Sequence, residues 1–289
     1  RGMSVLLVDG PGQGGTLRRH GVTTRFDYEV PVGKCIDWLT ARADVDAARI
    51  AVSGSSLGGY YAARAGAMEP RLAACIAHGA MWDIGARWKT RDDSHGLAKH
   101  MCWVFGGANM QASAEIAAPF KLEGVLENMR CPFLVIHGGH DVLGVENAKT
   151  VYDYAVKHGV KATLRLTSEE ETGAEHCQHD NPTLGQELMN DWLADKFGID
   201  HGTVKSGYPF QPEKRVQVAS MQTLVRRAAG MPKPRLIVLD AAGVTPHAVD
   251  WAVASGDHDL QTVFVVGPEG VDRAHGLAQA AVDALVRLD

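Results

Sequence analysis

Residues 54–58 read Gly-Ser-Ser-Leu-Gly, which matches the pattern G-x-S-x-G. An apolar run at residues 49–53 precedes this stretch, and a helical pattern at 57–67 follows it. Together they predict a strand that turns sharply into a helix and projects the hydroxyl of Ser56 outward from the turn. Glycines on both sides of the serine allow the strained backbone and close helix packing that such a turn needs. The alternative interpretation is a Gly/Ser-rich turn that only connects the strand to the helix and has no catalytic role.

The same alternation of strand and helix extends over most of the chain. Continuous apolar runs separated by helical patterns predict a mainly parallel sheet that is covered by helices on both faces. The predicted strands are 4–9, 49–53, 73–77, 133–137 and 162–167, and the predicted helices are 30–43, 57–67, 145–158 and 184–197. These elements define an α/β core at residues 1–200.

Two regions interrupt this alternation. Residues 83–128 are longer than a simple crossover needs and carry several aromatic side chains, which indicates a lid over a cleft. Residues 201–234 are rich in Pro, Gly, Lys and Arg and are expected to be a linker. Residues 235–289 are predicted to form a small βαβα appendage, with strands at 235–240 and 262–266 and helices at 246–254 and 271–288.

Composition limits the classes of partner. The chain has 289 residues, of which 45% are apolar and 22% charged, so it can bury a real core. A net charge of −5 argues against a nucleic acid or a membrane surface as the partner. The expected partner is a small-molecule substrate. Five cysteines without a C-x-x-C pair indicate reduced thiols and a cytoplasmic location. The composition is also compatible with a homodimer.

A serine hydroxyl becomes a good nucleophile only beside a base and an acid that orients the base. Asp141 follows a predicted strand within the stretch His-Gly-Gly-His-Asp at 137–141. His176 lies in the loop before the helix at 184–197, where residues 175–180 read Glu-His-Cys-Gln-His-Asp. We therefore expect a set of Ser56, Asp141 and His176, with His179 as the alternative base.

Further side chains are candidates for the same site. The N–H of Leu57, at the start of the predicted helix, can stabilise an oxyanion. Four aromatic residues are candidates for an apolar substrate pocket, with packing inside the lid as the alternative: Trp82, Trp88, Trp103 and Phe105.

A metal site is a competing interpretation of the polar loops. The clusters His137, His140 and Asp141, and His176, Cys177, His179 and Asp180, contain plausible zinc ligands. The sequence has no H-E-x-x-H motif, and both clusters are where an acid and a base are needed, so we expect no metal. The glycines at 10, 12 and 14 fit neither a phosphate loop nor a dinucleotide fingerprint, and no cofactor is expected.

The ordered motifs resemble the α/β-hydrolase superfamily over roughly residues 1–200. Residues 8–14, Val-Asp-Gly-Pro-Gly-Gln-Gly, look like the loop after the fourth strand of that fold. The late histidine and the D-G-P-G-Q-G stretch look closest to the 2,6-dihydroxypseudooxynicotine hydrolase-like group and the fungal polyketide-shortening hydrolases. This resemblance implies a serine-dependent hydrolase that cleaves a carbon–carbon bond next to a ketone, or an ester, in a small aromatic or polyketide-like substrate.

Two alternatives and one departure accompany the resemblance. Carboxylesterases and prolyl-oligopeptidase-like peptidases share much of the pattern, and a catalytically incomplete relative could act as a binding module. The family also has earlier strands, with a loop after the third strand that donates a second oxyanion N–H. The chain starts at what would be the fourth strand. We therefore expect either a fragment or a sheet that the strands after residue 234 complete.

Overall fold

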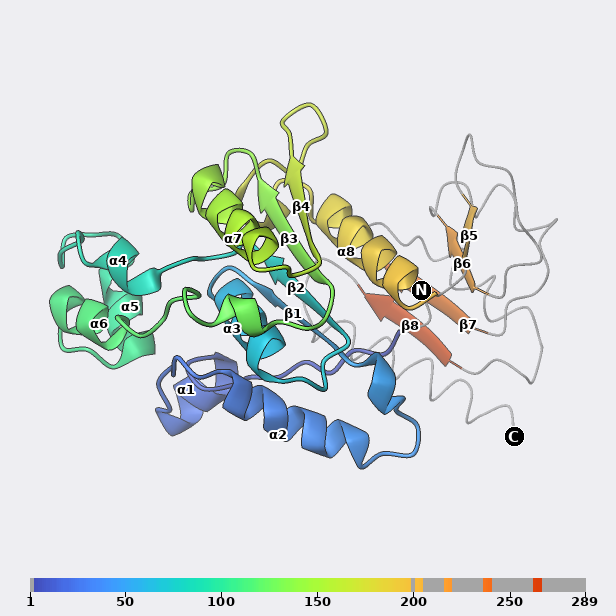
Figure 1. Cartoon of the computed structure of the whole chain (residues 1–289), viewed down its shortest axis with the longest axis horizontal. Coiled ribbons are helices and arrows are strands. Elements are labelled where there is room, and N and C mark those ends of the chain that lie inside the picture. The colour runs from blue at the N-terminus through green and yellow to red at the C-terminus, as the bar shows by residue number, and fades with distance from the viewer. Residues whose placement is uncertain (1–2, 199–200, 205–215, 220–235, 241–261, 267–289) are drawn as a thin grey trace. The chain divides into compact units, whose positions relative to one another are not determined.

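The computed structural model describes residues 3–198 and four short strands at 201–204, 216–219, 236–240 and 262–266 (Figure 1). The chain divides into two compact units, Arg1–Ile199 and Asp200–Asp289. None of the described helices is long and apolar enough to cross a lipid bilayer.

The first unit is built on a four-stranded parallel sheet in the order β1-β2-β3-β4 (Figure 1). The strands are β1 (Ala51–Ser55), β2 (Ala74–His78), β3 (Phe133–Gly138) and β4 (Ala162–Thr167). Every residue of β2 and β3 is buried, as expected for central strands covered on both faces. The predicted parallel sheet is confirmed, and four of its five predicted strands lie within two residues of the observed bounds.

Helices connect the strands and cover them. The helices are α1 (Gly14–His20), α2 (Glu29–Thr40), α3 (Leu57–Met68), α4 (Ile84–Trp88), α5 (Ala98–Phe105), α6 (Met110–Ile116), α7 (Val145–Lys157) and α8 (Pro182–Lys196), with single turns η1 (Ala47–Arg49), η2 (Leu126–Asn128) and η3 (His176–Gln178). The segment between β2 and β3, predicted as a lid, contains α4, α5, α6 and η2.

Alternate side chains of the central strands supply two separate cores. Cys75 and Val135 belong to the large cluster on the side of α3 and α7. Ile76 and Ile136 face the other way and pack with apolar side chains of α8. Successive side chains of a strand point to opposite faces, so the continuous apolar runs of β2 and β3 serve both layers of helices at once.

The predicted strand at residues 4–9 is wrong. These residues have no secondary structure, and their apolar side chains are solvent-exposed, with Val5 at 79% and Leu7 at 88%. A β-strand forms only when its backbone is hydrogen-bonded to a neighbouring strand. Among the described residues, β1 pairs only with β2 and not with residues 4–9. Within the part of the chain that the structure describes, the apolar run 5–8 has the composition of a buried strand but is paired with no other strand.

Within the second unit the structure describes two pairs of strands. Strands β5 (His201–Val204) and β6 (Val216–Ala219) are parallel and lie within the predicted linker 201–234, two stretches of which are therefore paired. Strands β7 (Leu236–Asp240) and β8 (Thr262–Val266) are also parallel and coincide with the strands expected there. The helices expected at 246–254 and 271–288 lie outside the described residues.

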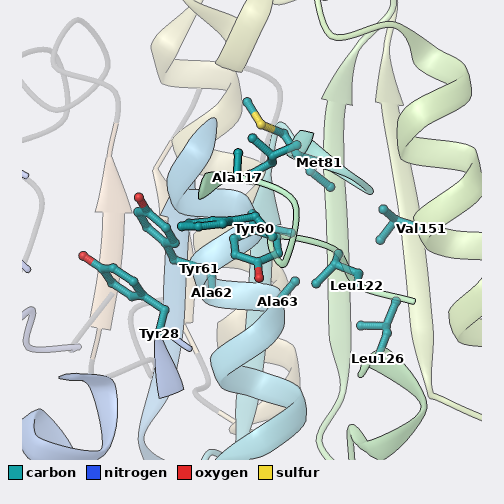
Figure 2. Close-up of a cluster of buried hydrophobic side chains, with 14 of the residues drawn as sticks. Tyr28, Tyr60, Tyr61, Ala62, Ala63, Met81, Ala117, Leu122, Leu126 and Val151 are labelled. Carbon is teal, nitrogen blue, oxygen red and sulfur yellow. The ribbon is translucent and has the colours of Figure 1, made fainter. Parts of the chain in front are cut away.

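A cluster of tyrosines anchors α3 to the chain that precedes the sheet. Tyr60 is completely buried, and its hydroxyl donates a hydrogen bond to the carbonyl of Phe26. The rings of Tyr28 and Tyr61 stack with centroids 3.7 Å apart, beside Tyr60 in the cluster of buried side chains (Figure 2). Burial raises the pKa of all three phenols. Since α3 begins at the turn of residues 54–58, this cluster fixes the helix on which that turn rests.

Replacing Tyr60 by alanine should lower the free energy of unfolding by about 3–5 kcal/mol, since it removes a fully buried ring and leaves a cavity. Urea unfolding followed by fluorescence measures the change. Trp38→Ala is the control: Trp38 is 53% exposed, and its loss should cost about 1 kcal/mol or less. Equal losses in the two variants would contradict the anchoring role of the cluster.

Candidate active site

The turn at residues 54–58 has the strained geometry that its sequence predicts. Strand β1 ends at Ser55, helix α3 begins at Leu57, and Ser56 between them has φ 58° and ψ −119°. A Cβ on Gly54 would lie 2.0 Å from the carbonyl oxygen of Gly58, so only glycine fits there. The N–H of Ser56 donates to the carbonyl of His78 at 2.7 Å, which ties the turn to the end of β2.

Ser56, His176 and Asp141 form a continuous hydrogen-bonded chain. The Oγ of Ser56 lies 2.9 Å from Nε2 of His176. The Nδ1 of the same ring lies 2.8 and 2.9 Å from the two carboxylate oxygens of Asp141. These residues come from the carboxyl ends of β1, β3 and β4 or the loops that follow, so the parallel sheet brings them to one edge. His179, the alternative base, lies beside His176, with ring centroids 6.0 Å apart.

Burial and hydrogen bonding oppose each other at Asp141. The carboxylate is completely buried, and this burial acts to raise its pKa. The hydrogen bonds from His176 and from the N–H of Leu143 outweigh burial and hold the pKa of Asp141 below its usual range. Asp141 in turn raises the pKa of His176, chiefly through their hydrogen bond. The imidazole is therefore a stronger base than a free histidine, with Nε2 aimed at the hydroxyl of Ser56.

The loop that carries His176 is held by its own polar contacts. The two carboxylate oxygens of Asp180 accept hydrogen bonds from the backbone N–H groups of Gly173, Ala174 and Glu175. A Cβ on Gly138, at the end of β3, would lie 2.1 Å from the carbonyl oxygen of Ala174. The loop thus packs against the backbone that leads to Asp141.

Three of the residues considered as zinc ligands are engaged in other contacts. Asp141 and His176 bind each other, and Asp180 binds backbone N–H groups. His137 is completely buried, and its Nδ1 lies 3.8 Å from Asp141, beyond hydrogen-bond distance. Among the described residues no three His, Cys, Asp or Glu side chains gather as a metal site would require.

Leu57 is the first residue of α3, so its N–H has no acceptor within the helix and lies beside Ser56. The positive end of the helix dipole is also located there. This donor is placed to bind negative charge that develops on an oxygen next to the serine.

The four aromatic candidates for a substrate pocket have different surroundings. Trp88 and Phe105 are buried within the large core cluster. Trp82 is partly buried against the ring of Tyr154, at 4.8 Å between centroids. Trp103 is 44% exposed beneath the guanidinium of Arg18. Trp82, Trp88 and Phe105 therefore belong to or border one core cluster, whereas Trp103 is exposed.

Two polar residues outside the expected set of Ser56, Asp141 and His176 join neighbouring segments of the chain. Arg87, on α4, donates to the carbonyls of Val142 at 3.0 Å and Leu143 at 3.4 Å. Asn147, in α7, accepts from the N–H of Trp82 at 2.9 Å and donates to the carbonyl of Ala80. Arg87 resembles a surface charge in sequence, and only the fold places it beside the backbone that follows Asp141.

Comparison with known proteins identifies the family of the chain. The family model described as the prolyl oligopeptidase family matches residues 1–200. The chain belongs to this family. It is 32% identical over 197 residues to a 2,6-dihydropseudooxynicotine hydrolase of Paenarthrobacter nicotinovorans, a match that covers 68% of the chain and 50% of that protein. It is 30% identical over 240 residues to the hydrolase ORFZ of Pyricularia oryzae, covering 69% of the chain and 56% of that protein.

A solved structure shows the same fold. The crystal structure of the 2,6-dihydroxy-pseudo-oxynicotine hydrolase matches with a TM-score of 0.55 and 29% identity, over 65% of this chain and 50% of that chain. The expected resemblance to the α/β hydrolases and to this group is confirmed. The chain spans about half the length of these relatives.

Gly54→Ala should destabilise the protein by about 1–3 kcal/mol, because the added methyl overlaps the carbonyl of Gly58. Gly58→Ala is the matched control: a Cβ there meets nothing within 4 Å, and alanine favours the helix. We expect the control to be as stable as the original protein or slightly more so in urea unfolding. A Gly54→Ala variant of unchanged stability would contradict the close approach at the turn.

Proposed function

We propose that this chain carries the catalytic groups of a serine hydrolase. The observation that carries the proposal is the unbroken contact from Ser56 through His176 to Asp141, with 2.9 Å and 2.8 Å between the bonded atoms. Ser56 is the nucleophile, His176 the general base, and Asp141 the group that orients the imidazole and stabilises its positive charge.

The reaction proceeds in two steps. Oγ of Ser56 attacks a carbonyl carbon while Nε2 of His176 takes its proton, and the N–H of Leu57 binds the oxygen that becomes negative. The bond from the carbonyl carbon to the leaving group then breaks, and the imidazolium gives its proton to that group. Water, activated by the same histidine, hydrolyses the acyl ester and restores Ser56.

The substrate class we propose is a small ketone in which a carbon–carbon bond is cleaved. Two relatives named as hydrolases, one of a pseudooxynicotine, match the chain over more than two thirds of its length. A carbon leaving group departs with an electron pair, so an adjacent ketone or an aromatic ring must hold the charge until His176 protonates it. The products are a carboxylic acid and the protonated carbon fragment. One water is consumed: its OH ends on the acyl carbon and its H on the leaving carbon.

The segment 83–128 is proposed as the lid over this site. Its helix α4 reaches the backbone after Asp141 through Arg87, and burial lowers the pKa of that guanidinium. A cover in this position would exclude water until the leaving carbon is protonated.

The competing function is that of an ester or peptide hydrolase, favoured by membership of the prolyl oligopeptidase family. The same three residues would act, with an oxygen or nitrogen leaving group. Hydrolysis rates on an activated ester, a proline-containing peptide anilide and a β-diketone, compared on one preparation, separate the two. We expect the highest kcat/KM on the β-diketone, and a preference for the anilide would exclude the carbon–carbon assignment.

A fluorophosphonate probe tests the nucleophile directly. We expect a single covalent adduct on the protein by intact-mass spectrometry and none on Ser56→Ala. Ser55→Ala is the matched control, since Ser55 is the neighbouring hydroxyl and should leave the adduct in place. A folded protein that gives no adduct would refute the proposal and favour a non-catalytic binding role.

Asp141→Asn should lower kcat by about 10,000-fold and shift the pH dependence of kcat/KM. His176 must be neutral to accept a proton, so activity is lost as pH falls through its pKa. The carboxylate of Asp141 raises that pKa, and its removal should move the acid limb to lower pH. An acid limb that stays in place would show that Asp141 does not act on the base.

A further inference from the structure

A second line of hydrogen-bonded polar side chains lies at the carboxyl edge of the sheet, near the groups assigned to the reaction. His78, the last residue of β2, is 7% exposed and uses both ring nitrogens. Its Nδ1 lies 3.0 Å from Oγ of Ser55, and its Nε2 contacts Oε1 of Gln178. Gln178 is completely buried and donates through Nε2 to Oγ1 of Thr167 at 3.1 Å.

The hydrogens of this line have one consistent direction. Thr167 donates its hydroxyl hydrogen to the carbonyl of Gly173, so it accepts from the amide of Gln178. The amide oxygen of Gln178 then faces His78, whose Nε2 must carry the hydrogen. Nδ1 is left as an acceptor for the hydroxyl of Ser55. All four side chains are neutral in this arrangement, and burial lowers the pKa of His78, which is consistent with an uncharged ring.

The backbone of His78 joins the same two loops. Its carbonyl accepts the N–H of Ser56 at 2.7 Å and the thiol of Cys177 at 3.6 Å. Cys177 and Gln178, directly after His176, have φ of 50° and 51°, a strained conformation for non-glycine residues. Contacts from outside the loop must hold such a backbone, and His78 supplies one to each of these two residues.

We propose that His78 is a positioning residue that fixes the distance between Ser56 and His176. The inference rests on the proposed function, because it is the serine–histidine contact whose geometry His78 sets. His78 touches neither the hydroxyl of Ser56 nor the carboxylate of Asp141, so it is not a catalytic residue. It binds the residue before the nucleophile on one side and the residue two after the base on the other.

Three variants test the inference. His78→Phe removes both side-chain hydrogen bonds of His78, and His78→Gln keeps an amide donor for Gln178. Ser55→Ala removes only the hydrogen bond between Ser55 and His78, at an exposed residue. We expect His78→Phe to react with a fluorophosphonate at Ser56 roughly 10- to 100-fold more slowly, because small misplacements of reacting groups have effects of this size. His78→Gln should recover most of the lost rate, and Ser55→Ala should stay within about fivefold of the original protein, since it breaks only one of the contacts. A His78→Phe variant that reacts within twofold of the original protein would overturn the inference.

An NMR measurement of the histidine side chains gives a readout independent of turnover. Long-range ¹H–¹⁵N spectra at pH 7 should show His78 as a neutral ring with the hydrogen on Nε2. The Nε2 signal of His176 in His78→Phe should move toward its position in Ser56→Ala, where the serine contact is absent. A His176 signal unchanged by His78→Phe, or a His78 ring with its hydrogen on Nδ1, would refute the positioning role.

The fluorophosphonate reaction and the NMR measurement together also separate this inference from the proposed function. If the original protein gives no fluorophosphonate adduct, the hydrolase assignment fails, and the NMR spectra alone decide whether His78 sets the contact. If the adduct forms and the His78 variants behave like the original protein, the hydrolase stands and the positioning role fails. His78→Gln guards against a variant that merely unfolds, because it retains a polar side chain of similar length.

Discussion

The left-handed backbone at Ser56 is the constraint around which the first unit is arranged. A non-glycine residue at φ 58° costs on the order of 1–3 kcal/mol, and neighbouring contacts must offset that cost. The carbonyl of His78 takes the serine N–H, Gly54 lets the backbone of Gly58 approach, and α3 is held down by its buried tyrosines. In return the serine hydroxyl stands clear of the strand, where a base can reach it.

The parallel sheet supplies the base and acid at the same edge. Because all four strands point the same way, the loops after β3 and β4 emerge beside the end of β1, although 120 residues separate Ser56 from His176. Asp141 is buried at this edge of the sheet, and its carboxylate accepts hydrogen bonds from His176 and from the backbone N–H of Leu143. A buried carboxylate without those partners would take up a proton and no longer strengthen the base.

The loops that carry these groups are held by polar contacts, some within a loop and some from distant segments of the chain. Asp180 binds the backbone of residues 173–175, Arg87 binds the two carbonyls after Asp141, and Asn147 bridges the ends of β2 and α7. The line from Ser55 through His78 and Gln178 to Thr167 then links one loop to the next. Each loop is therefore fixed internally and to its neighbours, as a site that acts by geometry requires.

The sequence by itself determined the parallel sheet, the turn at Ser56 and the candidates for acid and base. These signals are local: apolar runs of strand length, glycines around a serine, and polar residues just after a strand. It was wrong about residues 4–9, because an apolar run becomes a strand only beside a hydrogen-bonding neighbour. The sequence favoured His176 over His179 as the base, but it gave no distance from either ring to Ser56. Only the tertiary structure brought His78, Gln178 and Arg87 to the site, since their contacts join segments 23 to 100 residues apart and leave no periodic or motif signal.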